Sequence, residues 1–205
     1  MFRDRRDAGT QLADIVAAAV SPPAVVLGIP RGGVIVAAHV ASVLGWPLGI
    51  VVTKKLGAPG NPELGIGAVA PGVRVLEPDV IVALGIGRGW IDRESARVEA
   101  EVQRRAAAFA GRIVLDGETA VVVDDGVATG STARAAGLWA RRAGAARVVL
   151  AVPVAPRGVE QRVGDAFDAV VAVAIPAGFR AVGQYYDDFE QVSDDEVRAV
   201  LEARR

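Results

Sequence analysis

The sequence predicts an α/β domain built on a doubly wound, mostly parallel sheet that is flanked by helices. Two observations carry this prediction. Short runs rich in β-branched residues alternate along the chain with stretches of helical pattern. These runs are continuously apolar, which is typical of strands that helices cover on both faces. A length of 205 residues with 52% apolar residues allows a large core, so we expect residues 1–205 to form a single domain.

The elements follow from this alternation. Five strands are expected, at residues 24–29, 48–53, 120–124, 147–154 and 168–174. Helices are expected between and around them, at residues 4–20, 33–44, 91–110, 131–143, 158–163 and 194–203. In an open α/β sheet, ligands bind beyond the carboxyl ends of the strands. Residues that directly follow a strand are therefore the first candidates for a functional site.

One segment, residues 54–71, departs from the alternation. Its sequence, KKLGAPGNPELGIGAVAP, is crowded with glycine and proline, which predicts a flexible loop. The loop is expected to run into a short strand pair formed by GIGAVA and VRVLE. Mobility in this segment would be functional.

Composition excludes several classes of function. Lysine and arginine number 23 against 24 acidic residues, so no overall field recruits nucleic acid or an anionic membrane. The absence of cysteine and the single histidine exclude disulfides, thiolate zinc sites and multi-histidine metal cages. The longest uncharged stretch, residues 32–53, is broken by Gly45, Pro47 and Gly49 and fits a buried helix and strand better than a membrane span. We expect a soluble, cytoplasmic protein without a secretion signal.

The sharpest feature of the chain is the segment AVVVDDGVATGST. A buried strand ends at Asp124 and Asp125, and the chain then turns through residues 126–130 into a helix. Small residues, hydroxyls and backbone N–H groups gather at that helix N-terminus, where partial positive charge favours phosphate. Carboxylates accept hydrogen bonds from sugar hydroxyls, so the segment complements a phosphorylated sugar. The alternative is that the acids only cap a turn and Ser131 only caps a helix.

The same residues, VVVDDGVATGST, resemble the phosphoribosyl-diphosphate-binding signature of the type I phosphoribosyltransferases. The resemblance implies that Asp124 and Asp125 bind the ribose hydroxyls. It also implies that the 5′-phosphate is bound by the loop residues Ala128, Thr129, Gly130, Ser131 and Thr132.

Two more segments resemble diphosphate-binding parts of that family. GIPRGG at residues 28–33 resembles its diphosphate loop, with Arg31 as the cation and with Gly32 and Gly33 permitting close backbone approach. Lys54 and Lys55 resemble basic residues that neutralise the diphosphate. Two lysines at the start of a loop are also commonly just solvated.

The segment IPAGFRAVGQYYDDF resembles, with a one-residue offset, the base-binding segment of the hypoxanthine and guanine members. Phe179 would stack on the base and Asp187 would help to hold Mg²⁺, within a small C-terminal hood from about residue 175 to 205. The aromatics can equally pack on the core. Ala128 stands where oxopurine members have an aspartate that contacts the base, so the acceptor stays open.

The resemblance implies a Mg²⁺-dependent transferase, expected to be a homo-oligomer, with small-molecule substrates. It would transfer 5-phosphoribosyl from phosphoribosyl diphosphate to a nitrogenous base or amine and release diphosphate. The main alternative is a non-catalytic sensor of the same fold, which binds phosphoribosyl diphosphate or a nucleotide and regulates a partner. A hydrolase or ligase acting on another phosphorylated sugar is a further possibility.

Overall fold

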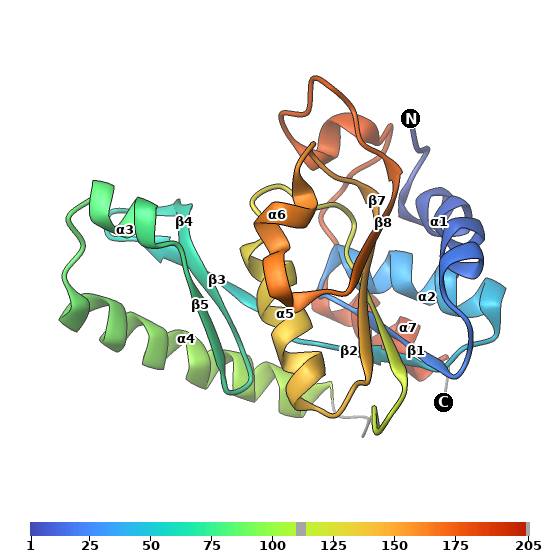
Figure 1. Cartoon of the computed structure of the whole chain (residues 1–205), viewed down its shortest axis with the longest axis horizontal. Helices are drawn as coiled ribbons and strands as arrows, with labels where there is room; N and C mark the ends of the chain where they lie inside the picture. The colour runs from blue at the N-terminus through green and yellow to red at the C-terminus, as the bar shows by residue number, and fades with distance from the viewer. Residues whose placement is uncertain (110–113, 204–205) are drawn as a thin grey trace.

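A five-stranded sheet forms the body of the molecule (Figure 1). The computed structural model describes residues 1–109 and 114–203 of the chain. The strands run in the order β2-β1-β6-β7-β8, and every neighbouring pair is parallel. Their bounds are β1 Ala24–Gly28, β2 Leu48–Ile50, β6 Thr119–Val123, β7 Arg147–Val154 and β8 Ala169–Ala174. The predicted parallel sheet is confirmed.

Helices cover both faces of this sheet, as the apolar strands predicted. On one face, α1 (Arg5–Ala19) and α2 (Gly32–Leu44) bury side chains such as Leu12 and Val36 against Val121. On the other face, α5 (Ser131–Arg142) and α6 (Val159–Val163) pack against alternate strand residues such as Val122. The 3-10 turn η1 (Gly164–Ala166) follows α6. Consecutive residues of one strand thus enter two separate cores, which explains why the strands are continuously apolar.

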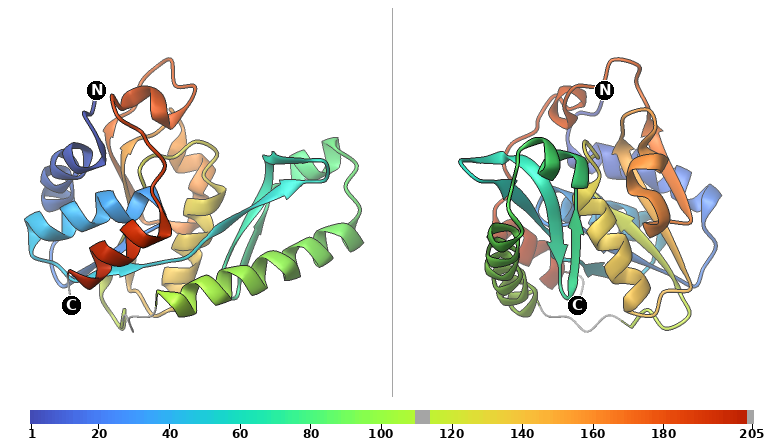
Figure 2. Two further views of the ribbon diagram at one scale, coloured as in Figure 1. Left: turned by 180° about the vertical axis from the view of Figure 1, so that it is seen from behind. Right: turned by 60° about the vertical axis from the view of Figure 1, so that its left-hand side comes forward.

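A second unit, which we call the arm (residues 54–108), projects from the body (Figure 2). Its antiparallel sheet has the order β3-β4-β5. The helix α4 runs along this sheet and packs on it through Val98 and Val102, which lie in one cluster with Leu56 and Ile66. Helix α5 also touches the arm, because Ala135 packs among the β4 and β5 side chains. The elements of the arm are β3 Lys54–Ala58, β4 Asn61–Ala70, β5 Val73–Leu76, α3 Pro78–Ala83 and α4 Arg88–Ala108.

The prediction of a loop over residues 54–71 is wrong for most of its length. The strand pair expected at its end is present as β4 and β5, but β3 already begins at Lys54 and β4 reaches back to Asn61. The glycines allow neighbouring strands to approach closely. A Cβ added at Gly57 would lie 2.5 Å from the Pro62 carbonyl oxygen, and a Cβ added at Gly67 would lie 2.1 Å from the Val75 carbonyl oxygen. Glycine in a strand often marks such an approach. The pairing register also shifts on both sides of Gly57.

The remaining predicted elements differ mainly at their ends. The strand expected at 48–53 ends at Ile50, and α3 was not expected. The C-terminal segment forms the 3-10 turn η2 (Val182–Tyr185) and the helix α7 (Asp194–Glu202), which begins with a capping box at Ser193. The last residue of the helix expected at 91–110 and residues 204–205 of the predicted hood lie outside the described residues. No helix within the described ranges is both long and apolar enough to span a bilayer.

Replacing Gly67 by alanine is expected to destabilise the chain by about 1–3 kcal/mol, because the new methyl group must displace backbone of the neighbouring strand. Gly178→Ala is the matched control: Gly178 lies outside the helices and strands, and an added Cβ there meets no atom within 4 Å, so its effect should stay within about 0.5 kcal/mol. Urea unfolding followed by circular dichroism measures both variants. Equal stabilities would contradict the close contact between β4 and β5.

Candidate active site

The acid pair, Asp124 and Asp125, lies at the carboxyl end of β6, the central strand of the body sheet. The buried run that forms β6 stops at Val123, so Asp124 is the first residue beyond the sheet. Asp124 Oδ1 accepts a hydrogen bond of 2.9 Å from the backbone N–H of Asp125. Both residues are half-buried. The site therefore begins where a ligand of an open α/β sheet is expected to bind.

The glycine turn (residues 28–33) packs directly on the acid pair. An added Cβ at Gly32 would lie 2.0 Å from Asp125 Oδ2, and one at Gly33 would lie 2.8 Å from Asp124 Oδ1. Glycine is required here by this approach. Arg31 directly precedes these glycines, is exposed, and occupies the N-cap position of α2. The structure thus places Gly32 and Gly33 against the acid pair, with Arg31 directly before them, and the binding roles of these three residues stay predictions.

A third element reaches the acid pair from the beginning of the chain. Arg5, in the first turn of α1, donates from Nε to Asp125 Oδ2 at 2.8 Å. Arg5 was not predicted as a site residue, because 120 positions separate it from Asp125 in the sequence. The one available signal was Asp4, whose side chain caps α1 by accepting from the N–H groups of Arg6 and Asp7 and so determines where the helix begins.

Burial governs the electrostatics of the pair. Removal from water raises the pKa of Asp124 well above its ordinary value, and the neighbouring charge of Asp125 raises it further. The pKa of Asp125 is also raised, chiefly by burial, while the Arg5 guanidinium opposes that rise. Burial therefore disfavours the charged form of both carboxyls, and a ligand that donates hydrogen bonds to the carboxylates offsets this cost.

The loop before α5 presents small residues at a helix start. Gly130 is the N-cap of α5 with a left-handed φ of 91°, and Ala128 and Thr129 before it are exposed. The first N–H groups of a helix have no acceptor within the helix, which suits an anion. The Ser131 hydroxyl donates to Glu77 Oε1 of the arm at 2.7 Å. Ser131 would therefore serve an anion through its backbone, while Thr132, half-buried, follows it in the first turn.

The C-terminal segment closes over the acid pair from another side. The Tyr186 hydroxyl donates to the backbone carbonyl of Asp125 at 2.6 Å, and its ring packs on Phe2 and Phe189. Burial raises the pKa of Tyr186 far above its usual range, so the hydroxyl stays protonated. From the sequence, Tyr186 was expected only as one of the aromatics that can pack on the core. It does pack, with 6% of its surface exposed, and it also contacts the site.

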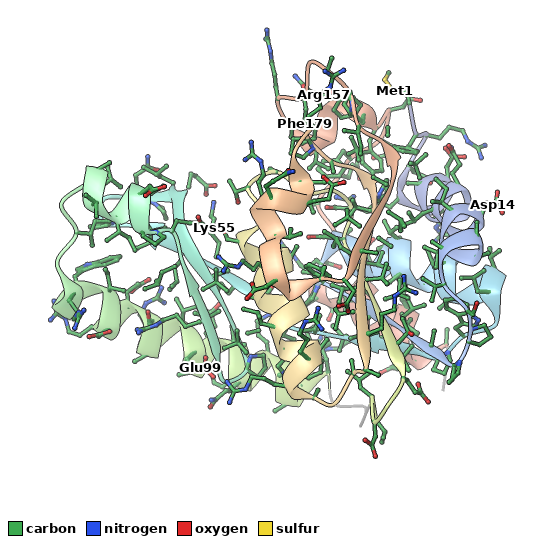
Figure 3. All side chains as sticks on the ribbon, in the orientation of Figure 1. Met1, Asp14, Lys55, Glu99, Arg157 and Phe179 are labelled. Carbon is green, nitrogen blue, oxygen red and sulfur yellow. The ribbon has the colours of Figure 1, made fainter. Side chains whose placement is uncertain are left out.

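Phe179 and Asp187 lie in the same C-terminal segment. Phe179 stacks on Tyr185 with ring centroids 5.8 Å apart and shares a cluster with Val154, at the end of the body where β7 ends (Figure 3). Asp187 is exposed, and its backbone N–H donates to the Phe2 carbonyl at 2.8 Å. Asp187 therefore directly follows the tyrosine that contacts Asp125. The stacking and metal-binding roles of these two residues stay predictions.

The two lysines are engaged within the arm. Lys54 pairs with Glu101 of α4. Lys55 donates to the Glu63 carbonyl at 2.8 Å and to its carboxylate at 3.2 Å, and Figure 3 shows it on the edge of the arm toward α5 and α6. Both lysines begin β3, whereas the sequence predicted that they start a loop.

Comparison with known proteins identifies the family. The family model described as "Phosphoribosyl transferase domain" matches residues 6–183. The chain belongs to the phosphoribosyl transferase domain family. Two Mycobacterium tuberculosis proteins, "Putative phosphoribosyl transferase MT0597" and "Putative phosphoribosyl transferase Rv0571c", are each 48% identical over 206 residues, which cover 98% of this chain. The chain spans 46% of the length of each.

Solved structures agree on the fold of this phosphoribosyl transferase domain. TT1426 from Thermus thermophilus has a TM-score of 0.81 and 42% identity, covering 99% of this chain and 98% of its own. AQ2163 from Aquifex aeolicus, at 12% identity with a TM-score of 0.50, covers 82% of this chain and 72% of its own, and shows the fold alone. The resemblance read from the motif VVVDDGVATGST is confirmed.

The acid pair of the phosphoribosyl transferase domain offers oxygen donors that fit Mg²⁺. Within residues 1–109 and 114–203 no three histidine, cysteine or acidic side chains gather as a possible metal cage. Mg²⁺, however, is commonly bound through one or two carboxylates together with substrate phosphates. The half-buried oxygens of Asp124 and Asp125 fit that donor set.

Asp124→Asn is expected to raise the stability of the domain by about 1 kcal/mol at neutral pH. The folded-state pKa of Asp124 lies above the ordinary value of 3.8, so the charged form costs stability at pH values above that folded-state pKa. The advantage of asparagine is lost as the pH falls through the folded-state pKa toward the ordinary one.

Thermal unfolding over a pH series measures this difference. Asp14→Asn, at an exposed position on the outer side of α1 (Figure 3), is the matched control and should change stability little at any pH. A loss of stability in Asp124→Asn at neutral pH would contradict the account of a charge buried at a cost.

Proposed function

We propose that the chain is a phosphoribosyltransferase that transfers the 5-phosphoribosyl group of phosphoribosyl diphosphate to a nitrogenous base or amine. The observation that carries the proposal is the meeting of three groups at one sheet edge. The acid pair, the glycine turn with Arg31, and the start of α5 all adjoin the end of β6. Together they offer acceptors for hydroxyls and donors for phosphates within one site.

Each part of the substrate has a complementary group. The ribose hydroxyls donate to Asp124 and Asp125, and the 5′-phosphate accepts from the N–H groups of residues 128–132 at the start of α5. The diphosphate faces Arg31 and the backbone at Gly32 and Gly33. This assignment accounts for the close glycine approach, because the backbone of the turn and the acid pair have to contact the same small ligand.

The reaction exchanges one bond at C1 of the ribose. The bond from C1 to the diphosphate oxygen breaks with its electron pair leaving on the diphosphate, and a bond from C1 to the acceptor nitrogen forms. The proton that the acceptor nitrogen loses passes to the released diphosphate or to solvent. Positive charge develops on the ring, where the acid pair stabilises it, and Arg31 stabilises the leaving group. Asp124 and Asp125 supply the oxygens that Mg²⁺ prefers, and a bound ion would neutralise charge on the departing diphosphate.

The acceptor is expected to bind under the C-terminal segment. Phe179 presents an aromatic face, already stacked on Tyr185, that suits a planar base. Lys54 and Lys55, which pair with Glu101 and Glu63 in the arm, would add positive charge for the diphosphate. Ala128 has no group that hydrogen-bonds to a base, so the choice of acceptor depends on the other residues of the site.

Release of diphosphate from phosphoribosyl diphosphate tests the proposal. Release should require both Mg²⁺ and a nitrogenous acceptor drawn from a panel of bases and amines. The double variant Asp124→Asn with Asp125→Asn should lower the rate by about 100-fold or more, because the charge that stabilises the ring is removed. Asp14→Asn is the control and should retain the rate.

The outcomes separate the proposal from its main rival. Tight binding of phosphoribosyl diphosphate without release, whatever the acceptor, would favour a non-catalytic sensor. Absence of any binding would contradict both functions.

A further inference from the structure

One guanidinium joins the acid pair to the C-terminal segment. Arg5 donates from Nε to Asp125 Oδ2 at 2.8 Å and from Nη1 to the Glu190 carbonyl at 2.8 Å. Its guanidinium also lies over the Phe189 ring, 4.0 Å from the centroid. Only 12% of the Arg5 side chain is exposed. The same planar group therefore contacts a proposed ribose-binding carboxylate and two residues of the segment that closes the site.

Arg5 is held firmly from its own side. Asp4 caps the helix one residue earlier, and Leu12 of the same helix is fully buried in the body. At Gly32 an added Cβ would lie 2.6 Å from Arg5 Nε, so the glycine turn closes the remaining space. The glycine turn therefore confines the Arg5 side chain on this side.

The C-terminal segment is tied to the residues just before α1. The Phe2 N–H donates to the Tyr185 carbonyl at 2.8 Å, and the Asp187 N–H donates back to the Phe2 carbonyl at 2.8 Å. The Asp188 N–H donates to the Arg3 carbonyl at 2.9 Å. Figure 2 shows the N-terminus beside this segment. Tyr186 extends this backbone contact to the Asp125 carbonyl, and Arg5 extends it to the Asp125 carboxylate.

Two consequences follow from a shared guanidinium. A sugar hydroxyl that donates to Asp125 holds the carboxylate in place, and a held carboxylate in turn holds Arg5 against Glu190 and Phe189. By thermodynamic reciprocity, order in the C-terminal segment then raises the affinity of the acid pair for the sugar by the same factor. Arginine suits this position because its planar fork makes several directed contacts at once, which a lysine cannot reproduce.

We propose that Arg5 is a positioning residue that couples occupancy of the acid pair by phosphoribosyl diphosphate to the order of residues 186–190. This inference rests on the proposed function, because that function supplies the ligand. Arg5 acts through Asp125 and does not itself contact the substrate.

Calorimetric titration with phosphoribosyl diphosphate and Mg²⁺ tests the affinity half of the proposal. Arg5→Met should raise the Kd by about 10- to 100-fold, the size expected when a hydrogen-bonded charge loses its partner. Arg5→Lys keeps the charge and should recover part of the loss. Arg6→Met makes the same change at the exposed neighbouring position and should stay within about 2-fold of the parent chain.

Amide hydrogen exchange tests the coupling half. In the parent chain, saturating ligand should slow exchange of the Asp187 and Asp188 amides by about 10-fold, as expected when a segment becomes more ordered. In Arg5→Met, at ligand concentrations that saturate the variant, this slowing should disappear. A purely structural role for Arg5 would speed exchange in the free protein yet leave the slowing by ligand intact, and that result would overturn the proposal.

Phe189→Leu keeps the test valid if Arg5→Met fails to fold. It removes the ring beneath the guanidinium without touching Asp125, and it should raise the Kd by about 3-fold. Parent-like binding and parent-like slowing in Arg5→Lys and Phe189→Leu would overturn the inference while leaving the proposed function in place. Failure of the parent chain to bind phosphoribosyl diphosphate would overturn the proposed function, and the inference with it.

Discussion

Two adjacent carboxylates, Asp124 and Asp125, lie at the end of a buried strand, and the surrounding elements provide groups that stabilise them there. Charges removed from water are costly unless other groups compensate them. The Asp125 carboxylate accepts a hydrogen bond from Arg5, and the Asp124 carboxylate accepts one from the backbone N–H of Asp125. Helix α2 begins at Gly32, in contact with the acid pair, so the positive end of its dipole lies close to the two carboxylates. Segments from both ends of the chain thus meet at one sheet edge.

These interactions offset only part of the cost of burying the acid pair, which suits a binding site. Burial still raises the pKa of both carboxylates, so hydrogen bonds from a ligand are favourable there. The Tyr186 hydroxyl donates its hydrogen bond to the backbone carbonyl of Asp125, so the Asp125 carboxylate stays available to other donors. A protein selected only for stability would have other residues at these two positions. Carboxyls with a strongly raised pKa are typical of functional sites.

Local sequence patterns predicted the parts of the fold whose cause is local. The continuously apolar runs predicted the strands of the body correctly, and the change from Val123 to two aspartates indicated the candidate site. The arm was misread because glycines such as Gly57 and Gly67 usually signal loops, whereas here they admit neighbouring backbone. The backbone that approaches each glycine belongs to a neighbouring strand, so the local sequence around the glycine does not indicate the contact. Arg5 was missed for the same reason, since its partner is distant in sequence.

The phosphate-loop and lysine predictions show the same limit at the level of side chains. The segment around Gly130 forms a helix start as expected, yet the Ser131 hydroxyl is directed to Glu77 of the arm. Lys54 and Lys55 likewise pair with Glu101 and Glu63. Residue type indicates which chemistry a position can perform, but the partner that a side chain meets depends on elements packed from elsewhere.

A crystal structure with bound ribose 5-phosphate tests the central claim most directly, because this ligand carries the hydroxyls and the phosphate without the reactive diphosphate. The account predicts the hydroxyls within hydrogen-bonding distance of Asp124 and Asp125, with the phosphate against the N–H groups of residues 128–132. A sugar phosphate bound away from the end of β6, or bound there with its phosphate turned from α5, would contradict it.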